Sequence, residues 1–240
     1  MEFLNQIKKE IHPSWENFIN DKEVLKELDK IEEEIGTNYY PKTKNVLRFL
    51  KTDLNNVKCV IVGLDPYREK TKDNEPFATG RSFEVNGYNS WMEKTRKSSL
   101  TNILKAIYLS ATNKKSTKVE EIRKEIANNN FNILPPNELF DNLEKQGVLF
   151  LNYGLTVDKN KSGSHLLYWQ KFSLMLSKYI LKNTKDVKWM LWSNDVQKLY
   201  CDIIPKENQI LNVHPRTSTF LSNNSFDKID SIDFTGTKKR

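Results

Sequence analysis

Four short apolar runs, spread along the chain, constrain the fold more than any other feature of the sequence. Each run is rich in β-branched, aliphatic or aromatic residues and is bounded by turn or polar residues, which is typical of a strand buried on both faces. Segments with helical periodicity separate the runs, and strands that alternate with helices predict a parallel sheet with helices on both faces. We therefore expect an α/β protein with a central four-stranded parallel sheet. The predicted strands cover residues 57–62, 148–151, 187–192 and 210–213.

The segments between these strands carry apolar residues at helical spacing. Val24, Leu28, Ile31 and Ile35, for example, recur among charged residues, as on a surface helix with one buried face. By contrast, residues 68–79 are mostly charged or polar, and a loop of this length indicates function or mobility rather than packing. The predicted helices cover residues 21–35, 45–50, 98–109, 113–130, 138–146, 168–181 and 196–203.

Length and composition narrow the class of protein further. With 240 residues, of which 38% are hydrophobic, the chain is predicted to form a single domain over residues 1–240. It contains no apolar run of the roughly 18 to 20 residues that would span a bilayer and begins without a secretion signal, so a soluble, cytoplasmic protein is expected. The cysteines Cys59 and Cys201 have no metal-ligand spacing and are predicted to be core thiols. A net charge of +7 favours a polyanionic partner such as nucleic acid, although a Lys-rich composition alone would also produce it.

Three of the four predicted strands lead into a polar side chain of a kind that does chemistry. Asp65, Asn152 and His214 lie at or just beyond the carboxyl ends of their strands, and these ends meet at one edge of a parallel sheet. An acceptor-only carboxylate, an amide and an imidazole could together read the edge of a nucleobase and stabilise charge at a breaking bond. Each residue also has a simpler explanation: Asp65 and Asn152 as turn formers, and His214 as a structural group, with His12 and His165 as rival histidines.

Several segments resemble motifs of family 1 uracil-DNA glycosylases, in the order in which that family has them. The segment 63–67, Gly-Leu-Asp-Pro-Tyr, resembles the water-activating motif, and segment 80–85 is similar to the one whose aromatic residue stacks on uracil. Segment 99–103 is similar to the phosphate-contacting helix start, and segment 146–157 to the base-reading strand. Ser164-His165 with Trp169 and Phe172, then Leu191-Trp192, and finally His214-Pro215 complete a resemblance that runs from about residue 12 to residue 226.

The resemblance implies hydrolysis of the bond between uracil and deoxyribose in DNA, without a metal or organic cofactor, after the base has been extruded from the stack. By this resemblance the catalytic residues are Asp65, which would orient water and stabilise the cationic sugar, and His214, which would donate a hydrogen bond to the departing uracil. The base-binding residues would be Leu64 through its backbone, Tyr67 against the 5-position, Phe83 by stacking and Asn152 at the Watson–Crick edge.

This chain departs from the family in the first and the last motif, and the departures in the last motif concern residues that are expected to contact DNA. Arg68 replaces the usual histidine of the first motif, as Leu64 replaces its glutamine; the poxvirus branch shows similar changes. In the last motif the family usually has His-Pro-Ser-Pro-Leu-Ser, and its leucine fills the gap that the flipped nucleotide leaves. Ser218 occupies the position of this leucine, and we consider Arg216 or Phe220 as the residue that fills the gap instead. The expected DNA-binding residues are Pro66, Ser99, Arg216, Thr217, Ser218, Thr219 and Phe220.

Two classes of function are open at this point. The first is an active uracil-DNA glycosylase of base-excision repair, acting on single- or double-stranded DNA. The second is a catalytically weak or inactive DNA-binding protein on the same fold that serves replication or a mobile element. The retained Asp65, Phe83, Asn152 and His214 favour the enzyme, and the altered segment 216–219 favours the binding protein. A monomer is expected, and by resemblance DNA-mimicking inhibitor proteins are further partners.

Overall fold

The structure is a computed structural model that describes residues 1–94, 97–112, 114 and 118–237. Its centre is a parallel sheet of four strands, as predicted, and the strand order is β3-β2-β5-β6. β2 pairs with both β3 and β5, so the second strand of the sheet is the one that leads into Asp65. The strands of the sheet are β2 (Cys59–Gly63), β3 (Val148–Asn152), β5 (Lys188–Trp192) and β6 (Gln209–Asn212).

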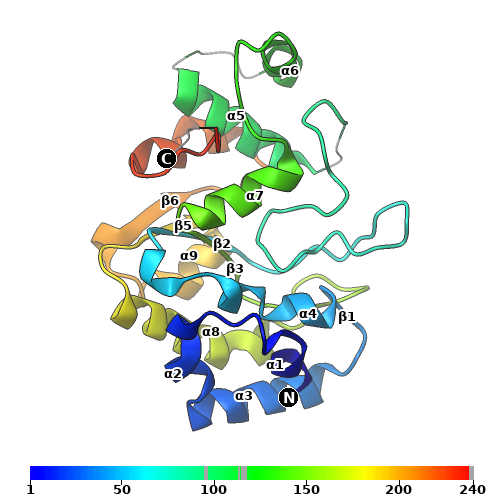
Figure 1. Ribbon diagram of the computed structural model, residues 1–240, viewed down its shortest axis with the longest axis vertical. Helices are drawn as coiled ribbons and strands as arrows, with labels where there is room; N and C mark the ends of the chain where they lie inside the picture. Colours follow the sequence, from blue (N-terminus) through cyan, green and yellow to red (C-terminus); the bar gives the residue numbers. More distant parts are fainter. Residues whose placement is uncertain (95–96, 113, 115–117, 238–240) are drawn as a thin grey trace.

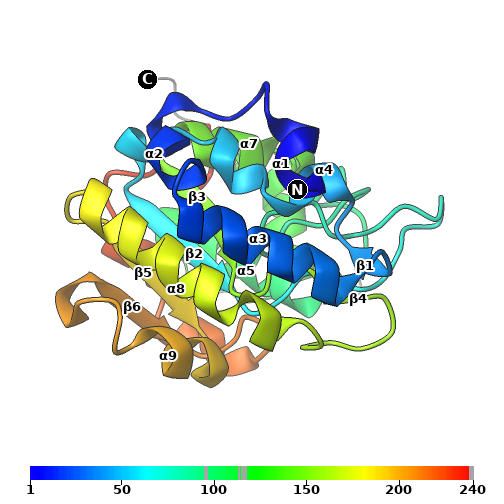
Figure 2. The same ribbon diagram turned by 90° about the horizontal axis from the view of Figure 1, so that it is seen from below.

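Helices cover both faces of the sheet, which gives three layers (Figure 1). One face packs against α1, α2, α3, α4, α8 and α9, and the other against α5, α6, α7 and the carboxyl-terminal segment. Figure 2 shows α3 and α8 side by side over the first of these faces. The helices are α1 (Glu2–Ile7), α2 (Glu16–Ile19), α3 (Lys22–Ile35), α4 (Thr43–Val46), α5 (Ser98–Thr112), α6 (Val119–Ala127), α7 (Pro136–Lys145), α8 (Leu166–Asn183) and α9 (Asn194–Tyr200).

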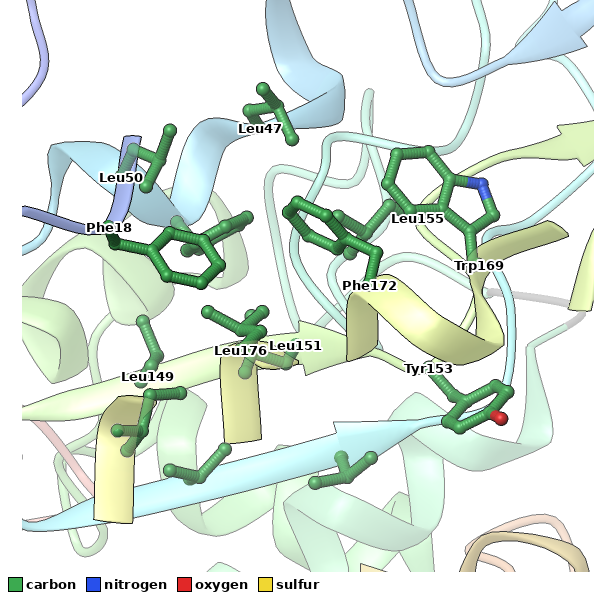
Figure 3. Packing of buried hydrophobic residues seen from close by; sticks show 14 of the residues in the cluster. Phe18, Leu47, Leu50, Leu149, Leu151, Tyr153, Leu155, Trp169, Phe172 and Leu176 are labelled. Carbon is green, nitrogen blue, oxygen red and sulfur yellow. The ribbon is translucent and has the colours of Figure 1, made fainter. Parts of the chain in front are cut away.

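The two-residue alternation of the strands divides the apolar side chains between two cores. In β2, Val60 and Val62 belong to one core, while Cys59 and Ile61 belong to the other. α8 adds Trp169, Phe172 and Leu176 to the first core, where Leu176 lies beside Leu151 of β3 and Trp169 lies near Leu155 (Figure 3). Burial of each such side chain contributes about 1.5 to 3 kcal/mol, so the sheet is a firm base for the loops at its carboxyl edge.

Several local details differ from the sequence-based predictions. α1 and α2 were not predicted, because helices of six and four residues are too short to show a clear period. The predicted helix 45–50 is α4 followed by a separate 3₁₀ turn, Arg48–Lys51. The predicted helix 113–130 is observed as α6, and its residues 113 and 115–117 lie outside the described part. Cys59 is buried as predicted, but Cys201, at the end of α9, is half-buried rather than in the core.

A small second sheet was also missed. β1 (Tyr39–Tyr40) pairs antiparallel with β4 (Val157–Asp158), and two-residue strands leave no detectable alternation in the sequence. This pair joins the segment before α4 to the loop that follows β3. Among the described helices, none is long and apolar enough to cross a membrane.

Candidate active site

A cavity of about 410 Å³ opens at the carboxyl edge of the sheet. Its volume is in the range of pockets that enclose a small ligand. The residues predicted to be catalytic or base-binding all line it, although they come from four segments that are far apart in the sequence. These residues are Leu64, Asp65, Tyr67, Phe83, Asn152 and His214.

Asp65 lies two residues beyond the end of β2 and is held by the loop before α8. Its Oδ2 accepts hydrogen bonds from the backbone N–H of Gly163 at 2.6 Å and from Oγ of Ser162 at 3.0 Å. Within the described residues Oδ1 has no hydrogen-bond partner. One oxygen therefore fixes the orientation of the carboxylate, and the other is available to a water molecule or a ligand.

Asn152 is the last residue of β3, and its side chain packs directly over Gly63. A Cβ atom built on Gly63 would lie 2.2 Å from Oδ1 of Asn152, so only glycine leaves room for the amide in this position. Asn152 is buried, with 6% of its surface exposed, and no described residue forms a hydrogen bond with its amide. A buried amide without a protein partner is suited to a polar ligand, because leaving it unpaired is unfavourable.

Phe83 lies in the cavity wall with its backbone in the left-handed region, at φ +64°. This conformation is strained for a bulky side chain and persists only where the surroundings enforce it. Here Oγ of Ser82 donates a hydrogen bond to the carbonyl of Ile61 at 2.8 Å. The Phe83 ring packs against Trp192 with 5.3 Å between ring centroids, and its centroid lies 6.1 Å from that of His214. The aromatic face and the imidazole thus border the same space.

His214 follows β6 and lines the cavity in a defined tautomer. The backbone N–H of Arg216 donates a hydrogen bond to Nδ1 of His214 at 3.1 Å, so in the neutral ring the proton is on Nε2. Burial lowers the pKa of His214 below its ordinary value, the charge of Arg216 lowers it further, and Asp195 opposes both. A neutral imidazole that donates through Nε2 follows from this environment.

The two rival histidines have structural positions. Nδ1 of His12 accepts a hydrogen bond from the N–H of Ser14 and caps a short 3₁₀ turn. His165 is buried, and its Nδ1 lies 2.9 Å from Oγ1 of Thr156, which also accepts a hydrogen bond from Trp169. Of the three histidines, His214 is the one that lines the cavity.

The residues on either side of Asn152 and Asp65 leave the cavity open. Tyr153 is buried in the core beneath α8 and packs edge-on against Tyr200, with 5.8 Å between centroids (Figure 3). Tyr153 therefore does not narrow the cavity, although a tyrosine beside Asn152 is bulky enough to do so. The carbonyl of Leu64 accepts a hydrogen bond from the N–H of Gly154 at 2.9 Å, which ties the loop after β2 to the loop after β3.

The predicted DNA-binding residues have mixed positions. Pro66, Ser99 and Arg216 line the cavity, with Arg216 exposed and Ser99 largely buried. Thr217, Ser218 and Thr219 are exposed beside it, on a segment whose Pro215 and Thr217 carbonyls accept hydrogen bonds from the Asn102 amide of α5.

Phe220 contradicts the prediction that it could serve as a wedge. Its side chain is fully buried and packs edge-on against Trp192, with 5.0 Å between centroids. A ring in the core cannot enter a base step, so the wedge function is not available to Phe220. Arg216 is the remaining candidate, and it also borders a second surface hollow beside Ser218.

The cavity wall also contains residues that the sequence analysis did not single out. Ser162 contacts Asp65, and Ser193, at φ +138°, caps α9 through a hydrogen bond that its Oγ accepts from the N–H of Val196. Arg81 is buried and forms ion pairs with Glu84, Asp141 and Glu144. Lys97, just before α5, also lines the cavity. The only sequence signal for these residues was their proximity to a recognised motif.

Across the described ranges, no group of three or more His, Cys, Asp or Glu side chains is placed to hold a metal ion.

The chain is similar along most of its length to curated proteins with one shared name. It is 31% identical over 230 residues to a uracil-DNA glycosylase of Borreliella burgdorferi (strain ZS7), covering 92% of this chain and 89% of that protein. It is also 31% identical over 190 residues to a uracil-DNA glycosylase of Mycoplasmopsis pulmonis, covering 78% and 72%. No protein-family model matches the chain.

Solved structures share the fold. The wild-type UNG of Nitratifractor salsuginis superimposes with a TM-score of 0.73 at 21% identity, covering 100% of this chain and 96% of that one. A mimivirus UNG variant in complex with UGI superimposes with a TM-score of 0.64 at 23% identity, covering 85% and 70%.

Proposed function

This chain belongs to the uracil-DNA glycosylase family, and we propose that it excises uracil from DNA in the cavity at the carboxyl edge of the sheet. The activity is a hydrolysis of an N-glycosyl bond and is a step of base-excision repair. The observation that best supports this location is the convergence of Asp65, Phe83, Asn152 and His214 on one cavity from four distant segments. That cavity, of about 410 Å³, is large enough for one pyrimidine.

Recognition of the base begins with Phe83 and Asn152. A flipped uracil would stack on the Phe83 ring, which Trp192 and the left-handed backbone hold in place. The amide of Asn152 offers a donor and an acceptor side by side, which matches a carbonyl and an N–H of uracil. Cytosine presents an amino group and an unprotonated ring nitrogen at the same edge, so the same amide position would leave cytosine poorly paired.

His214 stabilises the leaving group. As the bond between N1 of uracil and C1′ of the sugar breaks, its electron pair moves onto the base and spreads to the ring oxygens. The N–H at Nε2 of His214 is directed to the oxygen that gains this charge, because Nδ1 is occupied by the Arg216 backbone. A neutral donor suits this function, since it loses no proton and needs no proton from solvent.

Asp65 acts on the sugar and on the attacking water. Its carboxylate charge stabilises the oxocarbenium-like centre at C1′, as carboxylates do in other glycoside hydrolyses. Because Gly163 and Ser162 hold Oδ2, Oδ1 is free to accept a hydrogen bond from water and to take up its proton as the oxygen bonds to C1′. The products are an abasic site in the DNA and the uracil anion, which takes a proton from solvent to become free uracil, while Asp65 returns the water proton to solvent.

Arg216 fills the gap that the flipped nucleotide leaves. It is exposed at the rim, where the family usually has a serine, two positions before the place of its wedge leucine. A guanidinium can stack on bases and contact phosphates at the same time. Ser98 and Ser99 at the start of α5 are proposed to contact the backbone of the flipped nucleotide.

Three further expectations accompany this function. A DNA-mimicking inhibitor is a proposed protein partner, since a mimivirus UNG was solved in complex with UGI. A cytoplasmic location stays a prediction. The likeness of the first motif to the poxvirus branch also stays a prediction, because the comparisons do not separate branches of the family.

The alternative of a DNA-binding protein without turnover is not favoured, because the four site side chains are in place and the relatives are named for the activity. The test is a set of oligonucleotides that differ only in one base, uracil, cytosine or thymine, offered in single-stranded and duplex form. We expect release of uracil alone. DNA binding without release of any base would refute the proposal.

A further inference from the structure

Lys97 makes contacts that its place before α5 does not by itself explain. Its Nζ lies 2.6 Å from Oε1 of Glu69, 4.7 Å from the centroid of the Tyr67 ring and 5.2 Å from the centroid of the Phe77 ring. Only 16% of the Lys97 side chain is exposed. The ammonium group is thus largely withdrawn from water and directed at one carboxylate and two aromatic rings, an arrangement in which both kinds of contact are strengthened.

Two of these partners lie at the base of one hairpin. The N–H of Phe77 donates a hydrogen bond to the carbonyl of Glu69 at 2.9 Å, and nearer the tip the N–H of Thr71 donates to the carbonyl of Glu75 at 2.7 Å. The hairpin is the long loop predicted from the sequence, and it projects from the body of the protein at the right of Figure 1. Lys97 therefore ties the base of this projecting loop to the start of α5.

The third partner, Tyr67, is part of the cavity wall. Its ring also packs against a small apolar cluster that contains Tyr40 and Ala78. The ring also packs against the second core, to which α5 contributes, and the ammonium of Lys97 is the charged group among these restraints.

We propose that Lys97 is a positioning residue that fixes the Tyr67 ring and so determines how strictly the cavity excludes pyrimidines with a substituent at C5. The inference rests on the proposed function, in which Tyr67 faces that position. A steric wall discriminates only as well as it resists displacement, and a ring that can swing away accommodates a methyl group or a halogen. Loss of the ammonium removes an ion pair and two cation–π contacts that oppose such a swing.

A different reading of Lys97 predicts a different result. If the ammonium served chiefly to contact a DNA phosphate near Ser98, its loss would weaken the reaction equally for every base, because phosphate contacts carry no information about the base. The ratio of rates for two bases in the same oligonucleotide separates the two readings, since DNA affinity and the fraction of folded protein cancel in it.

The experiment compares kcat/KM for uracil and 5-bromouracil in one oligonucleotide sequence, for the parent chain and four variants. In Lys97→Met we expect the 5-bromouracil to uracil ratio to rise about tenfold, which is the scale of a lost, partly buried cation–π contact. In Glu69→Gln, which keeps the ammonium, we expect a rise of about threefold from loss of the ion pair alone. Lys97→Arg, and Lys72→Met as a charge-matched control on the exposed part of the same loop, should leave the ratio within about twofold.

An unchanged ratio in Lys97→Met, including an equal fall for both bases, overturns the inference. A parent chain that releases no base refutes the proposed function alone, and the inference is then judged by the binding of free uracil and free 5-bromouracil, followed by tryptophan fluorescence. The inference is supported if the ratio of the dissociation constant for 5-bromouracil to that for uracil is about tenfold smaller in Lys97→Met than in the parent chain. An unchanged ratio of dissociation constants, or no binding of either base to the parent chain, overturns it.

Discussion

Substitution of Gly63 by alanine tests the base-reading geometry without touching a side chain that is proposed to contact substrate. The new methyl group would lie 2.2 Å from Oδ1 of Asn152, whereas real Cβ contacts are essentially never shorter than 3.0 Å. Rotation of the amide brings its nitrogen to the same place, so it gives no relief. The Asn152 side chain must therefore move by about 0.8 Å, and a displacement close to 1 Å at a reacting site lowers the rate about 10²-fold.

The assay is kcat/KM for uracil release in a double-mutant cycle. Gly63→Ala should lower kcat/KM about 10²-fold with a loss of stability of about 1 to 3 kcal/mol. In an Asn152→Ala background, where the clashing oxygen is absent, Gly63→Ala should change the rate less than about threefold. Gly154→Ala is the matched control, because the one tight contact of its Cβ would be the flexible end of Leu166 at 3.0 Å, and its next contact, the Thr156 carbonyl at 3.6 Å, is at ordinary van der Waals distance. Equal effects of Gly63→Ala in both backgrounds would refute the reasoning.

Three further predictions concern the rest of the site. Because burial lowers the pKa of His214, NMR should show its ring neutral and protonated at Nε2 at pH 7, with a titration midpoint below 6.5. Between that midpoint and pH 6.5 the unfolded chain binds more protons than the folded protein. The free energy of unfolding should therefore fall as the pH drops through this window. A midpoint at or above 6.5 would contradict this. Phe220→Ala should lower the free energy of unfolding by about 3 to 5 kcal/mol, measured by urea denaturation. Arg216→Ala should leave this free energy unchanged and should slow the release of uracil from duplex DNA more than from single-stranded DNA. The reverse pattern would restore Phe220 as the wedge. DNA binding should weaken with salt, and Arg216→Ala should make the slope of log K against log salt shallower by about one; an unaltered slope would exclude a phosphate contact.

The sheet was predictable because its signal is local. Runs such as 57–62 and 187–192 are apolar except for one lysine at the second position, Lys58 or Lys188, and burial on both faces is what such a run requires. The small β1–β4 pair carries no comparable signal, since its two strands are joined by a contact between residues more than one hundred positions apart.

The site was predictable where a side chain follows a strand, and unpredictable where a long-range contact decides its role. Asp65 and His214 could be placed at one edge from the strand pattern alone. That Gly163, 98 residues away, would hold Oδ2 of Asp65 depends on a loop conformation that no local pattern indicates. The wrong prediction of Phe220 as a wedge has the same origin. An aromatic residue in a polar segment faces either solvent or the core, and here the long-range contact with Trp192 places the Phe220 ring in the core.

The most direct test of this account is single-turnover release of uracil from a single-stranded oligonucleotide with one deoxyuridine, compared between the parent chain and Asp65→Asn. We predict that the parent chain converts the oligonucleotide completely to free uracil and an abasic product. Asp65→Asn should bind the same DNA but release uracil at least about 10³-fold more slowly, because it has lost both the charge beside C1′ and the acceptor for the proton of water. Equal rates for the two proteins, or DNA bound by the parent chain with its uracil intact, would contradict the account.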